Sequence, residues 1–186
     1  MAFKYRLTRQ LKASPNSQKP LRKMKQHTYF DSPIGGIKIV GTPDGISEIS
    51  FVEQIPSSEM AVKLPNFLDE CQAQLEEYFA KKRREFSIKL HFQGSDFQVA
   101  VWNELLKIPY GFTTSYLAIA QKLGDRKAVR AVGQACGQNP IAVIAPCHRV
   151  IGLNGHLTGY ASGLDHKRDL LMLENPLAFG KQISLF

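Results

Sequence analysis

The sequence predicts an α/β protein with a small antiparallel sheet-plus-helix domain, followed by a mainly helical domain that contains a helix-turn-helix. Three patterns favour this fold class. Residues 27–53 alternate β-branched or aromatic residues with polar ones and are interrupted by Ser-Pro, Gly-Gly and Pro-Asp-Gly turns. Residues 64–82 carry apolar residues at helical spacing, and residues 113–140 form a helix-Gly-helix pattern. With 186 residues, 44% of them hydrophobic, the chain can bury the core of one sizeable domain or two small ones.

The positive charge of the chain is concentrated at its N-terminus. Residues 1–26 hold eight Lys or Arg and no acidic residue, which accounts for the whole formal net charge of +8. In the remainder, residues 27–97 are net acidic and residues 98–186 are net basic. We expect residues 1–26 to be a disordered, solvated tail, with electrostatic help in binding nucleic acid as the alternative. The basic C-terminal half favours a polyanionic partner.

The N-terminal domain is predicted to span residues 27–93. Tight turns divide its first part into two or three antiparallel strands. Residues 64–82 predict one amphipathic helix with Cys71 on its apolar face, so Cys71 is interpreted as a core thiol. A further strand is predicted over Phe86–Phe92, where apolar and polar residues alternate, and Gln93–Asp96 is the predicted linker.

The C-terminal domain, residues 94–186, is predicted to be mainly helical. Ser95 is placed to cap a helix that begins at Asp96. The apolar face of this helix consists of Phe97, Val101, Leu105 and Ile108. Gly124 divides the next pattern into two short helices, and Asp125 is placed to cap the second. Together these two helices outline the helix-turn-helix.

The second of these helices has few side chains suited to reading a DNA sequence. Small or apolar residues recur on it at helical spacing, namely Ala128, Ala131, Val132 and Ala135. Only Arg130 and Gln134 could contact base edges, which disfavours sequence-specific reading of the major groove. The small side chains would allow close approach to another backbone. An ordinary helical hairpin with a surface arginine is the alternative.

The cysteines exclude several classes of protein. Cys71, Cys136 and Cys147 are an odd number without a C-x-x-C pair, which argues against a disulfide framework and a four-ligand zinc site. Cys136 is interpreted as structural. We therefore expect a cytoplasmic protein without a metal or other cofactor. The longest apolar run, Ile141–Pro146, is far shorter than the roughly 20 residues of a membrane-spanning helix, so no membrane association is expected.

The stretch "IAVIAPCHRVIG" (Ile141–Gly152) places a thiol beside an imidazole at the end of an apolar run. Pro146 indicates a turn at Cys147, and His148 follows directly. A thiolate is a nucleophile where a base or a positive charge is close, but neighbours in sequence need not touch in space. From these residues alone, Cys147 can be a nucleophile, a metal ligand or a buried core residue.

Longer motifs around this stretch resemble those of a known family. "GQNP" precedes "PCHRVIG", and "NGHLTGYASGL" and "KRDLLMLE" follow it. With "FQVAVWNELLKIPYG" at the start, these motifs are similar to the O6-alkylguanine-DNA alkyltransferases, also called methylated-DNA:protein-cysteine methyltransferases. The resemblance runs from Phe97 to Glu174 and more loosely over residues 27–92. It implies that the N-terminal domain is ribonuclease H-like.

The resemblance implies an irreversible, single-turnover transfer of the alkyl group from O6-alkylguanine in DNA, and from O4-alkylthymine, to Cys147. His148 would take the thiol proton through a water molecule, and Glu174 would orient its imidazole. Tyr116 would face N3 of the leaving guanine. Asn139 would brace the active-site turn by backbone hydrogen bonds.

The resemblance also implies how DNA is bound. A monomer would bind double-stranded DNA through the minor groove with the alkylated base flipped out, and Arg130 would fill the vacated space. The expected DNA contacts are Arg130, Tyr116, Ala128, Ala131 and Gln134. The expected contacts to the flipped base are Val150, Tyr160, Ala161 and Ser162.

Two residues depart from the family pattern. Ser162 replaces a glycine in the segment over the pocket, which bears on the size of the alkyl group accepted, and Phe112 stands where polar residues are commoner.

Three other functions compete with alkyl transfer. A module that binds the lesion without transferring the alkyl group would carry a different residue at the position of Cys147. A transcription regulator would need more base-reading side chains. A Cys-His hydrolase would need an oxyanion hole and leaves Arg130 without a role.

Overall fold

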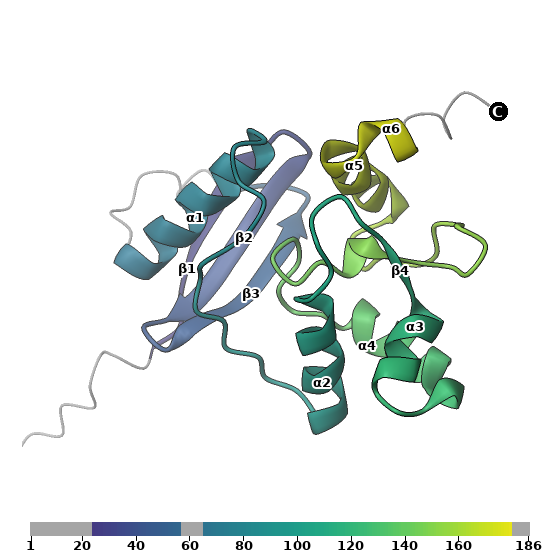
Figure 1. The fold of residues 1–186 in the computed structure, drawn as a ribbon. Coiled ribbons are helices and arrows are strands. Elements are labelled where there is room, and N and C mark those ends of the chain that lie inside the picture. The colour runs from purple at the N-terminus through teal and green to yellow at the C-terminus, as the bar shows by residue number, and fades with distance from the viewer. Residues whose placement is uncertain (1–23, 57–64, 180–186) are drawn as a thin grey trace, which may run out of the picture.

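The computed structural model describes residues 24–56 and 65–179 of the chain (Figure 1). Most of the predicted tail lies outside these residues, and strand β1 already begins at Gln26. A sheet and one helix precede a group of helices, as predicted, and the helical part contains the predicted pair joined at Gly124 (Figure 1). The α/β fold class inferred from the sequence is therefore confirmed.

The N-terminal sheet has three antiparallel strands in the order β1-β2-β3. They are β1 (Gln26–Ser32), β2 (Gly35–Thr42) and β3 (Gly45–Val52). Helix α1 (Asn66–Phe79) lies across one face of the sheet (Figure 1). Its apolar stripe, which includes the fully buried Cys71, packs on isoleucines of β2 and β3. Burial raises the pKa of the Cys71 thiol to about 12, as expected of a core thiol.

The strand predicted over Phe86–Phe92 does not form. This segment meets the outer edge of β3 only around Ile46, which donates to Lys89 O and accepts from His91 N, both at 2.8 Å. Further along the same edge, Ile49 instead pairs with the segment around Ile141. Because both segments pair with the same edge of β3, neither can form a longer run of hydrogen bonds with it. The alternation of residues 86–92 could not reveal this competition.

The C-terminal domain begins with α2 (Asp96–Leu105), which Ser95 caps as predicted in a capping box with Gln98. Phe97 is 38% exposed and does not join the predicted apolar face. Trp102 is buried instead and donates its indole N–H to Ala135 O at 2.8 Å. A ring anchored by this bond ties α2 to the helix-turn-helix.

The helix-turn-helix consists of α3 (Tyr116–Lys122) and α4 (Val129–Gly137). Gly124, at φ +87°, makes the turn between them. Asp125 caps a short 3₁₀ turn, Arg126–Ala128, rather than α4 itself. The domain ends with α5 (Leu164–Glu174) and the short α6 (Pro176–Phe179). A parallel pair, β4 (Thr114–Ser115) with β5 (Val150–Ile151), is too short to be predicted from periodicity.

Two apolar cores hold the candidate site between them. The first joins the sheet and α1 to residues 141–145 and to Leu170 of α5. The second joins α2, α3 and α4 to Cys147 and Val150. The segment from Ile141 to Val150 therefore passes from one core to the other. No helix in the described part of the chain is long and apolar enough to cross a membrane.

Candidate active site

Two tight turns in succession set the position of Cys147. Val143 has φ +68°, a conformation that a β-branched residue rarely adopts, and Ile144 N donates across it to Ala142 O at 2.8 Å. Pro146, at φ −83° and ψ 66°, then forms an inverse γ-turn in which Cys147 N donates to Ala145 O at 2.8 Å. The turn predicted at Pro146 is present, and Cys147 begins a short 3₁₀ helix, Cys147–Arg149.

Asn139 braces these turns. Its amide nitrogen donates to Ala145 O at 2.7 Å, and its amide oxygen accepts from Ile141 N at 3.1 Å. The same nitrogen lies 3.3 Å from the Cys147 sulfur. The bracing contacts expected of Asn139 are therefore present, and the amide also donates to the thiol. A donor to sulfur stabilises the thiolate over the thiol.

The Cys147 side chain is nearly enclosed, being 8% exposed. Burial raises its pKa, while the hydrogen bond from Asn139 and the charge of Lys167 act in the opposite direction. The resting group is therefore a thiol, which needs a base before it can react as a nucleophile. The buried Tyr160 hydroxyl has no hydrogen bond of good geometry among the described residues. Burial, then the adjacent Cys147 thiol, raises the pKa of Tyr160 well above its ordinary value.

The imidazole of His148 is fully buried and faces Glu174. Its Nε2 lies 2.9 Å from Glu174 Oε1, while its Nδ1 has no hydrogen-bond partner among the described residues. Because a carboxylate accepts, Nε2 carries the hydrogen and Nδ1 of the neutral ring presents a lone pair. Burial lowers the pKa of His148, and Glu174 opposes this effect. The ring is thus held neutral in the tautomer that a base at Nδ1 requires.

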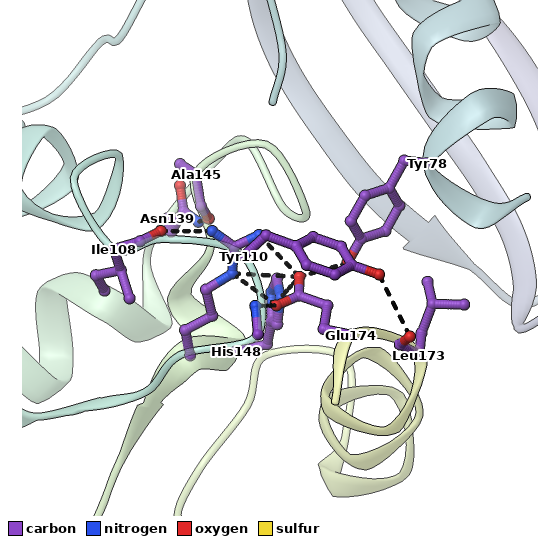
Figure 2. Close-up of polar contacts among 10 residues, drawn as sticks. Tyr78, Ile108, Tyr110, Asn139, Ala145, His148, Leu173 and Glu174 are labelled. Carbon is purple, nitrogen blue, oxygen red and sulfur yellow. Dashed lines mark hydrogen bonds and ion pairs between the residues drawn. The ribbon is translucent and has the colours of Figure 1, made fainter. Parts of the chain in front are cut away.

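Glu174, at the end of α5, is the centre of the polar network drawn in Figure 2. Arg149 donates to both of its oxygens, with Nε at 2.9 Å from Oε2 and Nη2 at 2.8 Å from Oε1. The hydroxyl of Tyr78 on α1 donates to Oε1 at 2.7 Å, and Gly111 N donates to Oε2 at 3.0 Å. These donors fix the carboxylate that orients His148.

Lys167 is a second buried charge in the site, and no motif predicted its place there. It is 0% exposed, and its ammonium donates to Val150 O and to Thr158 O, both at 2.7 Å. It also lies 3.4 Å from the hydroxyl of Tyr116, over whose ring it sits. Burial lowers its pKa, and the thiols of Cys147 and Cys136 oppose that shift. Lys167 therefore ties β5, α3 and the loop at Thr158 to one point beside the thiols.

A cavity of about 540 Å³ lies between α4 and residues 158–161. Tyr116, Arg130 and Gly133 line one side, and the other side includes Tyr160 and Ala161. The hydroxyl of Tyr116 donates to Thr158 O at 3.4 Å, which joins two of the residues that line the cavity.

The structure brings most of the predicted site residues to the cavity or to the Cys147 turn. Arg130, Ala131 and Gln134 are exposed on α4, whereas Ala128 is partly buried against the second core. The Val150 carbonyl, expected to contact the base, already accepts from Lys167 but keeps a second lone pair. The carbonyl of Ser162 accepts from His166. Four parts of the site were not predicted from the sequence: Tyr78, Gly111, Lys167 and the role of Arg149.

The other cysteines are separate from this chemistry. Cys136 on α4 is 6% exposed, and burial, then the neighbouring Cys147, raises its pKa to about 12. In residues 24–56 and 65–179, no three His, Cys, Asp or Glu side chains are grouped so that they could hold a metal ion.

Comparison with known proteins gives two matches that together cover most of the chain. Residues 25–92 match the family described as 6-O-methylguanine DNA methyltransferase, ribonuclease-like domain. Residues 96–176 match its DNA binding domain. The fold and the site therefore define a two-domain class of protein, in which a ribonuclease-like domain precedes a DNA-binding domain that carries a buried thiol.

Similar proteins narrow this class to one family. The methylated-DNA–protein-cysteine methyltransferase of Methanosarcina acetivorans is 48% identical over 80% of this chain and 97% of its own length. The crystal structure of the Mycobacterium tuberculosis O6-methylguanine methyltransferase matches 82% of this chain and 94% of its own at 44% identity, with a TM-score of 0.73. A structure of that enzyme in complex with DNA matches equally well, with a TM-score of 0.73 at 44% identity over 81% of this chain and 92% of its own. The chain belongs to the methylated-DNA–protein-cysteine methyltransferase family, as its motifs predicted.

Proposed function

We propose that the protein repairs DNA by moving the alkyl group of an O6-alkylguanine to the sulfur of Cys147. The observation that carries this proposal is the pairing of a buried, unlinked thiol with a histidine whose Nδ1 is free and whose Nε2 is held by Glu174. Attack on a saturated carbon favours a soft, polarizable nucleophile, which a thiolate is. The O-alkyl group of O4-alkylthymine has the same chemistry, so we include it as a substrate.

The proposed step balances without a cofactor. Nδ1 of His148 takes the thiol proton through a bridging water, the sulfur–carbon bond forms, and the bond from carbon to O6 breaks. The departing guanine needs a proton or a hydrogen-bond donor as it leaves, and Tyr116, which lines the cavity, would supply this donor to N3. The Lys167 ammonium lowers the pKa of the Cys147 thiol and favours the transient thiolate. A thioether cannot revert under these conditions, so each molecule acts once.

We propose that α4 binds the minor groove of double-stranded DNA with the damaged base flipped into the cavity. The exposed Ala131 would allow a close approach, and Arg130, which lines the cavity, would occupy the vacated stack. Reading in the minor groove is degenerate, which suits repair at any sequence. We further propose a monomer, because the described site is formed within one chain. The three unlinked cysteines favour a reducing compartment, so we propose that the protein acts in the cytoplasm.

Stoichiometry tests this proposal. A duplex with one O6-methylguanine, in excess over protein, is expected to have guanine restored in a single burst that equals the amount of protein, with no later turnover. Cys136→Ala is the matched control, because it removes the neighbouring buried thiol and should keep the burst. Cys147→Ala should restore no guanine. Continued turnover by the wild type, or a normal burst from Cys147→Ala, would reject the mechanism.

Tyr78→Phe tests how the N-terminal domain affects the pKa of His148, the proposed general base. The charged or titratable groups that face His148 are Glu174, Arg149 and Lys167, and Tyr78 reaches it only through Glu174. Without the hydroxyl, the charge on Oε1 of Glu174 acts more strongly on His148 and raises the pKa of His148. Because the base must be neutral, the acid limb of the rate profile should move to higher pH by about half a unit or more.

The measurement is the rate of Cys147 alkylation by iodoacetamide across a series of pH values. Tyr110→Phe is the matched control, since its hydroxyl donates to the backbone oxygen of Leu173 at 3.3 Å and not to Glu174. The acid limb of this control is expected to coincide with that of the wild type. Equal shifts in the two variants, or no shift in Tyr78→Phe, would show that Tyr78 does not tune the base.

A further inference from the structure

The segment that covers the thiol is short and is bounded by two glycines in unusual conformations. We define this lid as residues 159–163. Gly159 has φ +22° and Gly163 has φ +95°, and Gly163 N donates to Tyr160 O at 3.0 Å to close a turn between them. Tyr160 and Ala161 of the lid line the cavity, and burial beside Cys147 raises the pKa of the Tyr160 hydroxyl. Tyr160 also packs against the apolar core that contains Cys147, so a shift of the lid would change the space beside the sulfur.

Each end of the lid is held by a side chain of α5. Lys167 donates to Thr158 O at 2.7 Å, just before the lid. His166 holds the other end, where its Nδ1 lies 2.7 Å from the carbonyl oxygen of Ser162. A carbonyl oxygen can only accept, so Nδ1 of His166 carries the hydrogen. The Ser162 carbonyl lies directly before the Gly163 hinge, so this bond restrains the hinge.

The ring of His166 is itself fixed by the N-terminal sheet. It lies against the ring of Phe51 on β3, with ring centroids 4.2 Å apart and planes tilted by 33°. A Cβ added at Gly35, at the start of β2, would stand 3.3 Å from Nε2 of His166, so the edge of the ring lies close to the backbone of this glycine. Phe51 and Gly35 thus restrict the position of the His166 ring against the sheet.

We propose that His166 is a specificity-determining positioning residue, which clamps the Ser162 carbonyl against the N-terminal sheet and so limits the size of the alkyl group that fits over Cys147. This inference rests on the proposed alkyl transfer. His166 does not touch the reacting atoms and acts through Ser162 alone. A lid released at Gly163 opens more easily, and the gain should be larger for a bulky alkyl group than for methyl.

Two substitutions separate the hydrogen bond from the packing. His166→Phe keeps a ring against Phe51 but removes the donor to Ser162. His166→Asn removes the ring but keeps an N–H donor close to the position of Nδ1. The rates of alkyl transfer are measured from one duplex that carries either O6-benzylguanine or O6-methylguanine, so that effects on DNA binding cancel in the ratio of the two rates.

The clamp predicts that His166→Phe raises the benzyl-to-methyl ratio about three- to tenfold, as expected for the loss of one hydrogen bond. It also predicts faster hydrogen exchange of the lid amides. His166→Asn should return the ratio to within about twofold of the wild type, although it loses packing. An unchanged or lower ratio in His166→Phe, or equal changes in both variants, would overturn the clamp. A wild type that transfers neither group would instead reject the proposed function.

Discussion

Glu174→Gln is expected to slow transfer to Cys147 at least about 100-fold, because the base loses the partner that fixes its tautomer. The Glu174 side chain is 0% exposed and is the only carboxylate, among the described residues, that pairs with Arg149. A glutamine would leave the Arg149 charge without its counterion and turn an amide N–H toward donors. Breaking a buried ion pair in this way should lower the free energy of unfolding by about 3–5 kcal/mol.

Urea unfolding and single-turnover rates measure the two effects separately. Glu104→Gln is the matched control, because Glu104 pairs with the exposed Lys107 on the surface and should change neither quantity appreciably. Adding Arg149→Met to Glu174→Gln removes the unpaired charge, so stability should recover in part while the rate stays low. A rate near that of the wild type in Glu174→Gln would make Glu174 a structural residue only.

The same carboxylate sets the pH range over which its network is stable. Burial raises the pKa of Glu174, but the hydrogen bonds from His148 and Arg149, together with the charge of Arg149, outweigh burial and hold this pKa well below its ordinary value. A depressed pKa contributes stability that is fully present above the unfolded-state value of about 4.3 and is lost as pH falls through the folded-state value. The contribution of Glu174 should therefore persist until strongly acid pH.

Arg130→Ala is expected to reduce repair of O6-methylguanine in duplex DNA about 100-fold, and to change the reaction with free O6-benzylguanine by less than about twofold. The reason is that flipping a base costs a few kcal/mol, and in the proposed binding mode Arg130 would offset this cost by filling the stack. Free O6-benzylguanine has no stack to leave. The comparison of the two substrates separates the role of Arg130 in filling the stack from the chemistry at Cys147.

Arg126→Ala is the matched control for Arg130→Ala. Arg126 is exposed on the 3₁₀ turn before α4, so its replacement removes a positive charge near the same surface. Without this charge, attraction to a DNA phosphate is weaker, so duplex binding should fall modestly and depend less on salt. If Arg130→Ala loses as much activity on free O6-benzylguanine as on the duplex, Arg130 does not act by filling the stack.

Elements with local signals could be predicted from the sequence. The turn residues predicted the strands of the sheet, and Ser95 as an N-cap predicted the start of α2. The segment 86–92 alternates like a strand, but whether it pairs depends on which other chain segment occupies the edge of β3. Such competition is a property of the tertiary structure, and no local pattern carries it.

The site could be predicted only where its motif is continuous. Cys147 and His148 are adjacent, and Glu174 followed from the family resemblance. Tyr78 lies in the amphipathic helix predicted over residues 64–82, and its ring is in the core, but its hydroxyl reaches Glu174 from the other domain. A buried tyrosine usually finds a partner for its hydroxyl, which was the one available signal. Lys167 begins the KRDLLMLE motif, but its role was not predicted, because its acceptors are backbone carbonyls.

The most direct test of the central claim is the mass of the intact protein after incubation with a duplex that carries one O6-methylguanine. We expect the addition of one methyl group, mapped to the peptide that contains Cys147, with Cys71 and Cys136 unmodified. Cys147→Ala should keep its original mass under the same conditions. An unmodified wild type after guanine is restored, or a methyl group that persists in Cys147→Ala, would contradict the assignment of Cys147 as the acceptor.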